Sequence, residues 1–202
     1  AALGVIRIIV DGQLHLPLTK ILRAAAKGYG FAKVDADVLP FIRDRLRGYL
    51  RDQQMRHDIV AAALADADGD DIRLMASRAT ALVAFLAAPD GNGLMAGWRR
   101  VSSILAAEEK KAKIAFVASS DPALFNEIEQ ALFTPLSALA DNHASVDAQL
   151  AALGALRFPI DEFFDKIVVN DDDSAIRLNR LGLLAMIRDR MLAVADFTKI
   201  EG

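Results

Sequence analysis

The adjacent pair His57-Asp58 is the most metal-like motif in this sequence. Neighbouring His and Asp side chains supply two metal ligands in helical phosphohydrolases, but such a site also needs a further His and a distant Asp. The remaining histidines, His15 and His143, do not complete that set. We therefore interpret His57-Asp58 as a surface pair at a helix start, with Asp58 beside the positive end of the helix, and predict no metal site.

Two further acidic clusters suggest chemistry at first sight. The run 170–173 (Asn-Asp-Asp-Asp) lacks the alternating ligands, central Gly and terminal Glu of a calcium loop, so we interpret it as a helix cap. Glu108 and Glu109 precede Lys110 and Lys111, which is typical of a solvated helix end. The sequence also lacks a Gly-rich phosphate loop and a Ser nucleophile elbow. We predict no catalytic residue and no cofactor site in this chain.

The arginines are more informative. Of the 24 basic residues 16 are Arg, the side chain suited to bidentate phosphate contacts and to stacking on bases. Arg43, Arg47 and Arg51 recur at a spacing of four, which forms one ridge on a helix. Acidic residues alternate with them, so a merely solvated face is the alternative interpretation. The net charge of −3 argues against a surface that coats nucleic acid everywhere but leaves room for a local basic face.

Helices must position these side chains. Apolar residues recur at helical spacing in four segments, and no strand-like alternation stands out. The chain of 202 residues is 53% hydrophobic and has no Cys, so it can form a core without disulfides. We predict an all-α helical bundle without a membrane-spanning helix, in which Tyr49 and Trp98 belong to the core. The four segments are 37–54, 71–87, 92–108 and 174–195.

A weak boundary lies in the stretch 27–33, where Gly28 and Gly30 interrupt the helical pattern. We expect residues 1–34 to be the end of an upstream helical segment and residues 35–202 to form the main helical domain.

Several motifs occur in an order and spacing that resemble a known family. The runs 163–170 (FFDKIVVN) and 176–184 (IRLNRLGLL) resemble the end of the DALR-type anticodon-binding domain of aminoacyl-tRNA synthetases. Together with 41–49 (FIRDRLRGY), 97–105 (GWRRVSSIL) and 194–202 (VADFTKIEG), they are similar to the bacterial glycine–tRNA ligase β subunit. The resemblance covers residues 37–202 well and the preceding residues more loosely.

This resemblance implies that the chain is the C-terminal part of a longer, cytoplasmic β subunit that binds the anticodon region of glycine tRNA. The whole enzyme, an α2β2 ligase by family resemblance, would use ATP and Mg²⁺ at a catalytic site in its α subunit. We expect no cofactor in this part of the chain. A helical protein-interaction module for subunit assembly, without RNA contact, is the alternative function.

The candidate tRNA contacts divide into two groups. We expect the arginine ridge on 37–54 to bind phosphates, and three further arginines, at 99, 100 and 177, to lie near the bases. We expect Arg180, which follows Asn179, to be structural instead and to pair internally with an acid such as Asp165. The six candidates are Arg43, Arg47, Arg51, Arg99, Arg100 and Arg177.

Overall fold

A computed structural model describes residues 1–30, 34–65, 69–139 and 145–201. These residues form α-helices and short 3₁₀-helices and include no strand, which confirms the all-α prediction. His143 and residues 31–33 of the expected domain boundary lie outside the described residues.

The chain forms two compact units. The first comprises residues 1–83 and 195–202, and the second comprises residues 84–194. The division expected at residues 34 and 35 stays a prediction.

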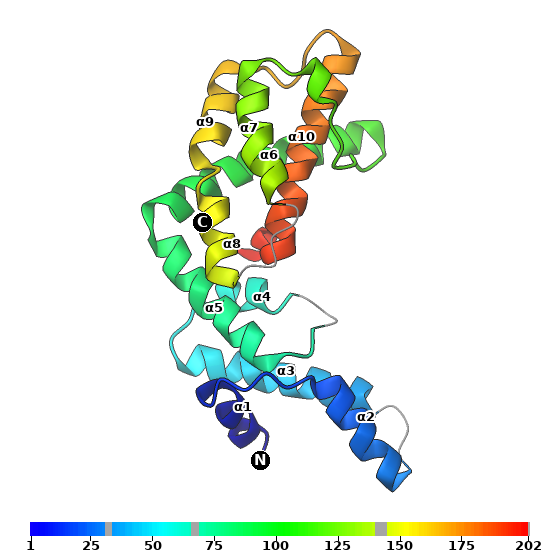
Figure 1. Cartoon of the computed structure of the whole chain (residues 1–202), viewed down its shortest axis with the longest axis vertical. Helices are drawn as coiled ribbons and strands as arrows, with labels where there is room; N and C mark the ends of the chain where they lie inside the picture. The colour runs from blue at the N-terminus through cyan, green and yellow to red at the C-terminus, as the bar shows by residue number, and fades with distance from the viewer. Residues whose placement is uncertain (31–33, 66–68, 140–144, 202) are drawn as a thin grey trace. The chain divides into compact units, whose positions relative to one another are not determined.

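In the first unit, α1 and α2 both pack on α3 (Figure 1). The helix α3 buries Ile42, Leu46 and Leu50, so one stripe of its surface faces the core and the opposite stripe faces solvent. The short α4 contacts both α3 and η2, a 3₁₀-turn near the end of the chain. The elements are α1 (Ala2–Asp11), α2 (Leu18–Tyr29), α3 (Val34–Asp52), α4 (His57–Ala63), α5 (Ile72–Ala87), whose last turn belongs to the second unit, and η2 (Phe197–Lys199).

In the second unit, α10 contacts α6, α7 and α8, while α9 packs on α6 and α7. Every residue from 179 to 185 of α10 is buried, so this helix is enclosed on all sides at its middle. The elements are α6 (Pro89–Ala112), η1 (Pro122–Leu124), α7 (Glu127–Ala138), α8 (Val146–Gly154), α9 (Arg157–Lys166) and α10 (Ser174–Val194).

Local sequence explains where several of these helices begin and how closely they pack. Pro89 occupies the first turn of α6, where its missing N–H costs no hydrogen bond. A capping box of Asn126 and Glu129 starts α7. Gly97 of α6 lets α9 approach closely, because a Cβ there would lie 2.7 Å from Cγ2 of Ile160.

The predicted helices 37–54, 71–87, 92–108 and 174–195 are confirmed as α3, α5, α6 and α10, with shifts of a few residues at their ends. Trp98 is buried, as predicted. Tyr49 is only half-buried, and its hydroxyl lies 3.3 Å from Oδ1 of Asp11. Among the described residues, no single helix is long and apolar enough to cross a membrane; α5 and α6 meet the length and composition criteria only as a bent pair.

Candidate nucleic-acid interface

The predicted phosphate ridge lies on α3 in the first unit. Arg47 and Arg51 are exposed, because the core stripe of the helix is on its other side. Arg43 is half-buried, and its Nη2 donates to the carbonyl oxygen of Gly69. The ridge therefore consists of two outward cations and one arginine that also holds the segment before α5.

Asp70 anchors that segment to α2. Its Oδ2 accepts from the backbone N–H of Thr19, 2.8 Å away, in the first turn of α2. Burial raises the pKa of Asp70, but bonds from the Thr19 hydroxyl and amide and the nearby charge of Arg43 outweigh it, so the pKa lies below its usual range. Asp70 is thus an ionised cap for α2, supplied by a distant part of the chain.

A pocket of about 280 Å³ lies at the contact of α2 with α3. Its rim carries an ion pair in which Nη2 of Arg23 lies 2.8 Å from Oδ2 of Asp35. The lining residues are Thr19, Arg23, Asp35, Ala36, Leu39, Pro40 and Arg43.

The solvent side of α3 also carries an aromatic ring that the sequence analysis did not single out. Phe41 is exposed, and the guanidinium carbon of Arg45 lies 4.9 Å from its ring centroid. A cation over an exposed ring is a surface on which an unpaired base can stack. The spacing of four between Phe41 and Arg45 was a signal that could have identified it.

The other three candidate arginines belong to the second unit, and they differ among themselves. Arg99 and Arg100 are exposed on α6. The guanidinium carbon of Arg100 lies 4.3 Å from the ring centroid of Phe164 on α9. Arg100 therefore combines an exposed charge with an aromatic neighbour, as a base-stacking site requires.

Arg177 has a different environment. Its Nη2 forms an ion pair with Oε2 of the buried Glu108, and its Nε lies 3.0 Å from Oδ1 of Asn170. The hydrogen bond from Lys111 has the largest effect on the pKa of Glu108, and the bond from Arg177 adds to it. Together they hold that pKa below its usual range although burial raises it. The interpretation of Glu108 as part of a solvated helix end is therefore wrong, since Arg177 from α10 covers it.

Glu109, its neighbour, is engaged as well. Its Oε1 lies 2.8 Å from Nη1 of Arg188 and 3.0 Å from the backbone nitrogen of Phe116. The end of α6 is thus fixed to α10 by two carboxylates, whereas the sequence pattern indicated a free surface.

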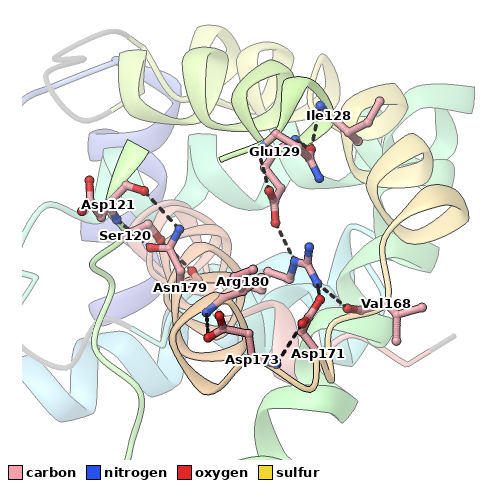
Figure 2. A network of polar contacts seen from close by, with 11 residues as sticks. Ser120, Asp121, Ile128, Glu129, Val168, Asp171, Asp173, Asn179 and Arg180 are labelled. Atoms are coloured by element: carbon pink, nitrogen blue, oxygen red, sulfur yellow. Dashed lines mark hydrogen bonds and ion pairs between the residues drawn. The ribbon is translucent and has the colours of Figure 1, made fainter. Parts of the chain in front are cut away.

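A buried network surrounds Arg180 (Figure 2). Nε lies 2.6 Å from Oε1 of Glu129, and Nη1 lies 2.6 Å from Oδ2 of Asp171 and 2.9 Å from the carbonyl oxygen of Val168. Arg180 does pair internally, as expected, but with Glu129 and Asp171 instead of Asp165.

Asp171 and Asp173 of the run 170–173 have different roles. Oδ1 of Asp173 accepts from the amide of Ala175, 2.8 Å away, so Asp173 caps α10 as predicted. The backbone amide of Asp173 has the largest effect on the pKa of Asp171, and Arg180 adds to it, so that pKa lies below its usual range. Asp171 is thus a partner of Arg180 and not a cap.

Asn179, next to Arg180, fixes the start of η1. Its Oδ1 accepts from the amide of Asp121 at 2.6 Å, and its Nδ2 donates to the carbonyl of Asp121 at 3.1 Å (Figure 2). Ser120 donates to the carbonyl oxygen of Asn179. Asn179 and Arg180 therefore fix two separate loops onto α10.

The His57-Asp58 pair begins α4 as expected, but Asp58 is buried, so the surface interpretation is wrong for that residue. Asp58 accepts from Nε of Arg56 at 3.1 Å and from the amide of Glu201 at 2.9 Å. Burial raises the pKa of Asp58, but the hydrogen bonds from Arg56 and from the backbone amides of Glu201 and Ile59 lower it by more, so the pKa lies below its usual range. Asp58 thus anchors the end of the chain to α4. No group of three or more His, Cys, Asp or Glu in the described ranges has metal-site geometry.

One comparison with known proteins bears on this geometry. Residues 1–65 match the family model of the glycyl-tRNA synthetase beta subunit. The match covers α1 to α4 and includes Arg43, Arg47 and Arg51. It supports a β-subunit identity and a role in glycine–tRNA ligase, an aminoacyl-tRNA synthetase.

The glycyl-tRNA synthetase beta subunit match includes the motif at 41–49 and ends before the motifs at 97–105, 163–170, 176–184 and 194–202. The match therefore includes all of the residues before 37, whose resemblance to the family was loose, and only residues 37–65 of the part whose resemblance was good. The DALR-type assignment of the later residues stays a prediction.

Proposed function

We propose that this chain, as part of the glycine–tRNA ligase β subunit, binds the anticodon region of glycine tRNA during ATP-dependent aminoacylation. The observation that supports this proposal is the coincidence on α3 of the family match with two outward arginines, Arg47 and Arg51. Guanidinium groups in that position bind backbone phosphates and fix the register of an RNA, while base edges are read by neighbouring groups.

The second unit offers a second set of contacts. We assign Arg99 and Arg100 to the neighbourhood of the bases, because both are exposed and Arg100 already stacks on Phe164. Arg177 is a weaker candidate, since Glu108 already compensates its charge. Catalysis, ATP and Mg²⁺ belong in this proposal to the α subunit of a cytoplasmic α2β2 enzyme.

Fluorescence anisotropy of labelled glycine tRNA tests this function. The wild-type chain should bind glycine tRNA more tightly than the same tRNA with a changed anticodon, and binding should weaken steeply with salt because phosphate contacts release counterions. Equal affinity for the two tRNAs at low salt contradicts anticodon recognition.

A subunit-assembly module is the second candidate function. It is favoured by apolar side chains on the outside of α1, where Leu3, Val5 and Ile8 are exposed. This function predicts a stable complex with the purified α subunit and no preference among tRNAs. Size-exclusion chromatography of the mixture distinguishes it from tRNA binding.

A further inference from the structure

We propose that the pocket between α2 and α3 receives one unpaired nucleotide of the bound RNA. This inference rests on the proposed tRNA binding and adds to it a site for a base. Of the six arginines chosen from the sequence, Arg43 lines this pocket and the other five do not.

The size of the pocket limits what it can hold. At about 280 Å³ it lies near the lower end of the range for small-molecule sites. It has room for one flat ring system with its substituents and none for a base-paired stem. A splayed-out base of a single-stranded loop is an RNA element of this size.

The charged groups of the lining disfavour a metal cation and offer both hydrogen-bond donors and an acceptor. Arg23 and Arg43 outnumber the carboxylate of Asp35, which is itself paired with Arg23. A neutral ligand that both donates and accepts hydrogen bonds suits this mixture. The Watson–Crick edge of a nucleobase has that property.

A backbone acceptor adds to this pattern. Pro40 lies within α3 and has no N–H, so the carbonyl of Ala36 does not receive the helical hydrogen bond from residue 40. Both residues line the pocket. The carbonyl of Ala36 is thus an acceptor without its usual helical donor, and the adjoining side chains of Leu39 and Pro40 give the face of a base an apolar surface.

The position of the pocket connects it to the phosphate ridge. Arg43 lines the pocket, and Arg47 and Arg51 follow it at intervals of four residues, about 6 Å each along the helix. A strand whose phosphates lie along this ridge therefore passes the mouth of the pocket, where one base can turn inward.

Filling the pocket tests the inference. Ala36→Leu adds volume at the pocket wall without changing charge, and Ala25→Leu makes the same change at an exposed position of α2 outside the lining. The probes are glycine tRNA and a set of the same tRNA with one abasic site at each unpaired position of the anticodon loop. Affinities of the 202-residue chain are measured by anisotropy, and circular dichroism checks that each variant is folded.

One abasic position should weaken binding of the wild-type chain by about tenfold, in the range of base contacts of this kind. Ala36→Leu should weaken binding of the intact tRNA by a similar factor and be insensitive to that same abasic site. Ala25→Leu should behave like the wild-type chain. If Ala36→Leu is poorly folded, Arg23→Gln, which removes a donor at the rim, should show the same loss of sensitivity.

The failures are distinguishable. If the wild-type chain prefers glycine tRNA but Ala36→Leu binds every probe as the wild-type chain does, the pocket inference is overturned and the proposed function stands. The pocket inference is also overturned if every abasic site weakens binding of Ala36→Leu by the same factor as it weakens binding of the wild-type chain, because the two changes then act independently. If the wild-type chain shows no preference for glycine tRNA, the proposed function fails and the pocket inference fails with it.

Discussion

Arg180 of α10 and Glu129 of α7 form an ion pair in which both residues are buried, with Nε and Oε1 2.6 Å apart. The same guanidinium also bonds Asp171 and the carbonyl of Val168. Burying a charge is costly unless partners compensate it fully. Here the partners come from α7 and from the connection between α9 and α10, so the network holds both of these parts against α10 in one arrangement (Figure 2).

Arg180→Met should reduce the free energy of unfolding by about 3–5 kcal/mol, because it leaves the buried carboxylate of Glu129 without a counter-charge. Urea denaturation followed by circular dichroism measures the change. Arg99→Met, an exposed position on α6, is the matched control and should shift the free energy by less than about 0.5 kcal/mol. Similar values for the two variants would contradict a structural role for the network.

The sequence predicted the helices better than these contacts, for a physical reason. An apolar stripe such as Ile42, Leu46 and Leu50 lies within a few turns of one helix, so spacing alone reveals it. Glu108 pairs with Lys111 of its own helix, as nearby spacing allows, but also with Arg177, 69 residues away, which the sequence pattern did not indicate. Pairing between distant segments depends on packing, which local spacing does not contain.

The candidate site shows the same limit. Arg43 and Arg47 are equivalent by spacing, but the Gly69 segment covers one and leaves the other in solvent. The pocket beside Arg43 needs Thr19 from α2 as well as Leu39 from α3, and nothing in either segment predicts that contact. The arginine-rich helix was therefore predictable, and the exposure of each of its arginines was not.

Two helix glycines should respond in opposite ways to alanine. A Cβ at Gly182 of α10 would overlap the carbonyl oxygen of Ser119, and backbone gives way less easily than a side chain. Gly182→Ala should therefore cost about 1–3 kcal/mol of unfolding free energy. A Cβ at Gly48 of α3 meets no atom within 4 Å, so Gly48→Ala should add about 0.5–1 kcal/mol through helix propensity. Thermal unfolding tests both signs, and a stabilised Gly182→Ala would contradict the close approach.

Because of Glu108, the free energy of unfolding should fall as the pH is lowered in the acid range. The pKa of Glu108 is lowered in the folded chain by Lys111 and Arg177, so the unfolded chain binds a proton at a higher pH than the folded chain does. The stabilisation that ionised Glu108 gives to the folded chain is complete above the ordinary glutamate pKa of about 4.3. It is lost as the pH falls through the lower pKa that Glu108 has in the folded chain. Glu108→Gln should flatten the fall in urea midpoint between pH 5 and pH 3. Arg177→Gln should flatten it in part, and an unchanged slope in both variants would exclude this ion pair as a cause.

The exposed arginines of α3 should determine the salt dependence of RNA binding. Replacing Arg47 and Arg51 together by Gln removes two outward cations, so the slope of log affinity against log salt should decrease by about two. Affinity should fall by the same factor for glycine tRNA and for the tRNA with a changed anticodon, because phosphates are common to both. The control replaces Arg7 and Lys27, two exposed cations of α1 and α2, by Gln and should keep the wild-type slope. If both double variants change the slope equally, the attraction comes from overall charge and α3 has no special contact with the RNA backbone.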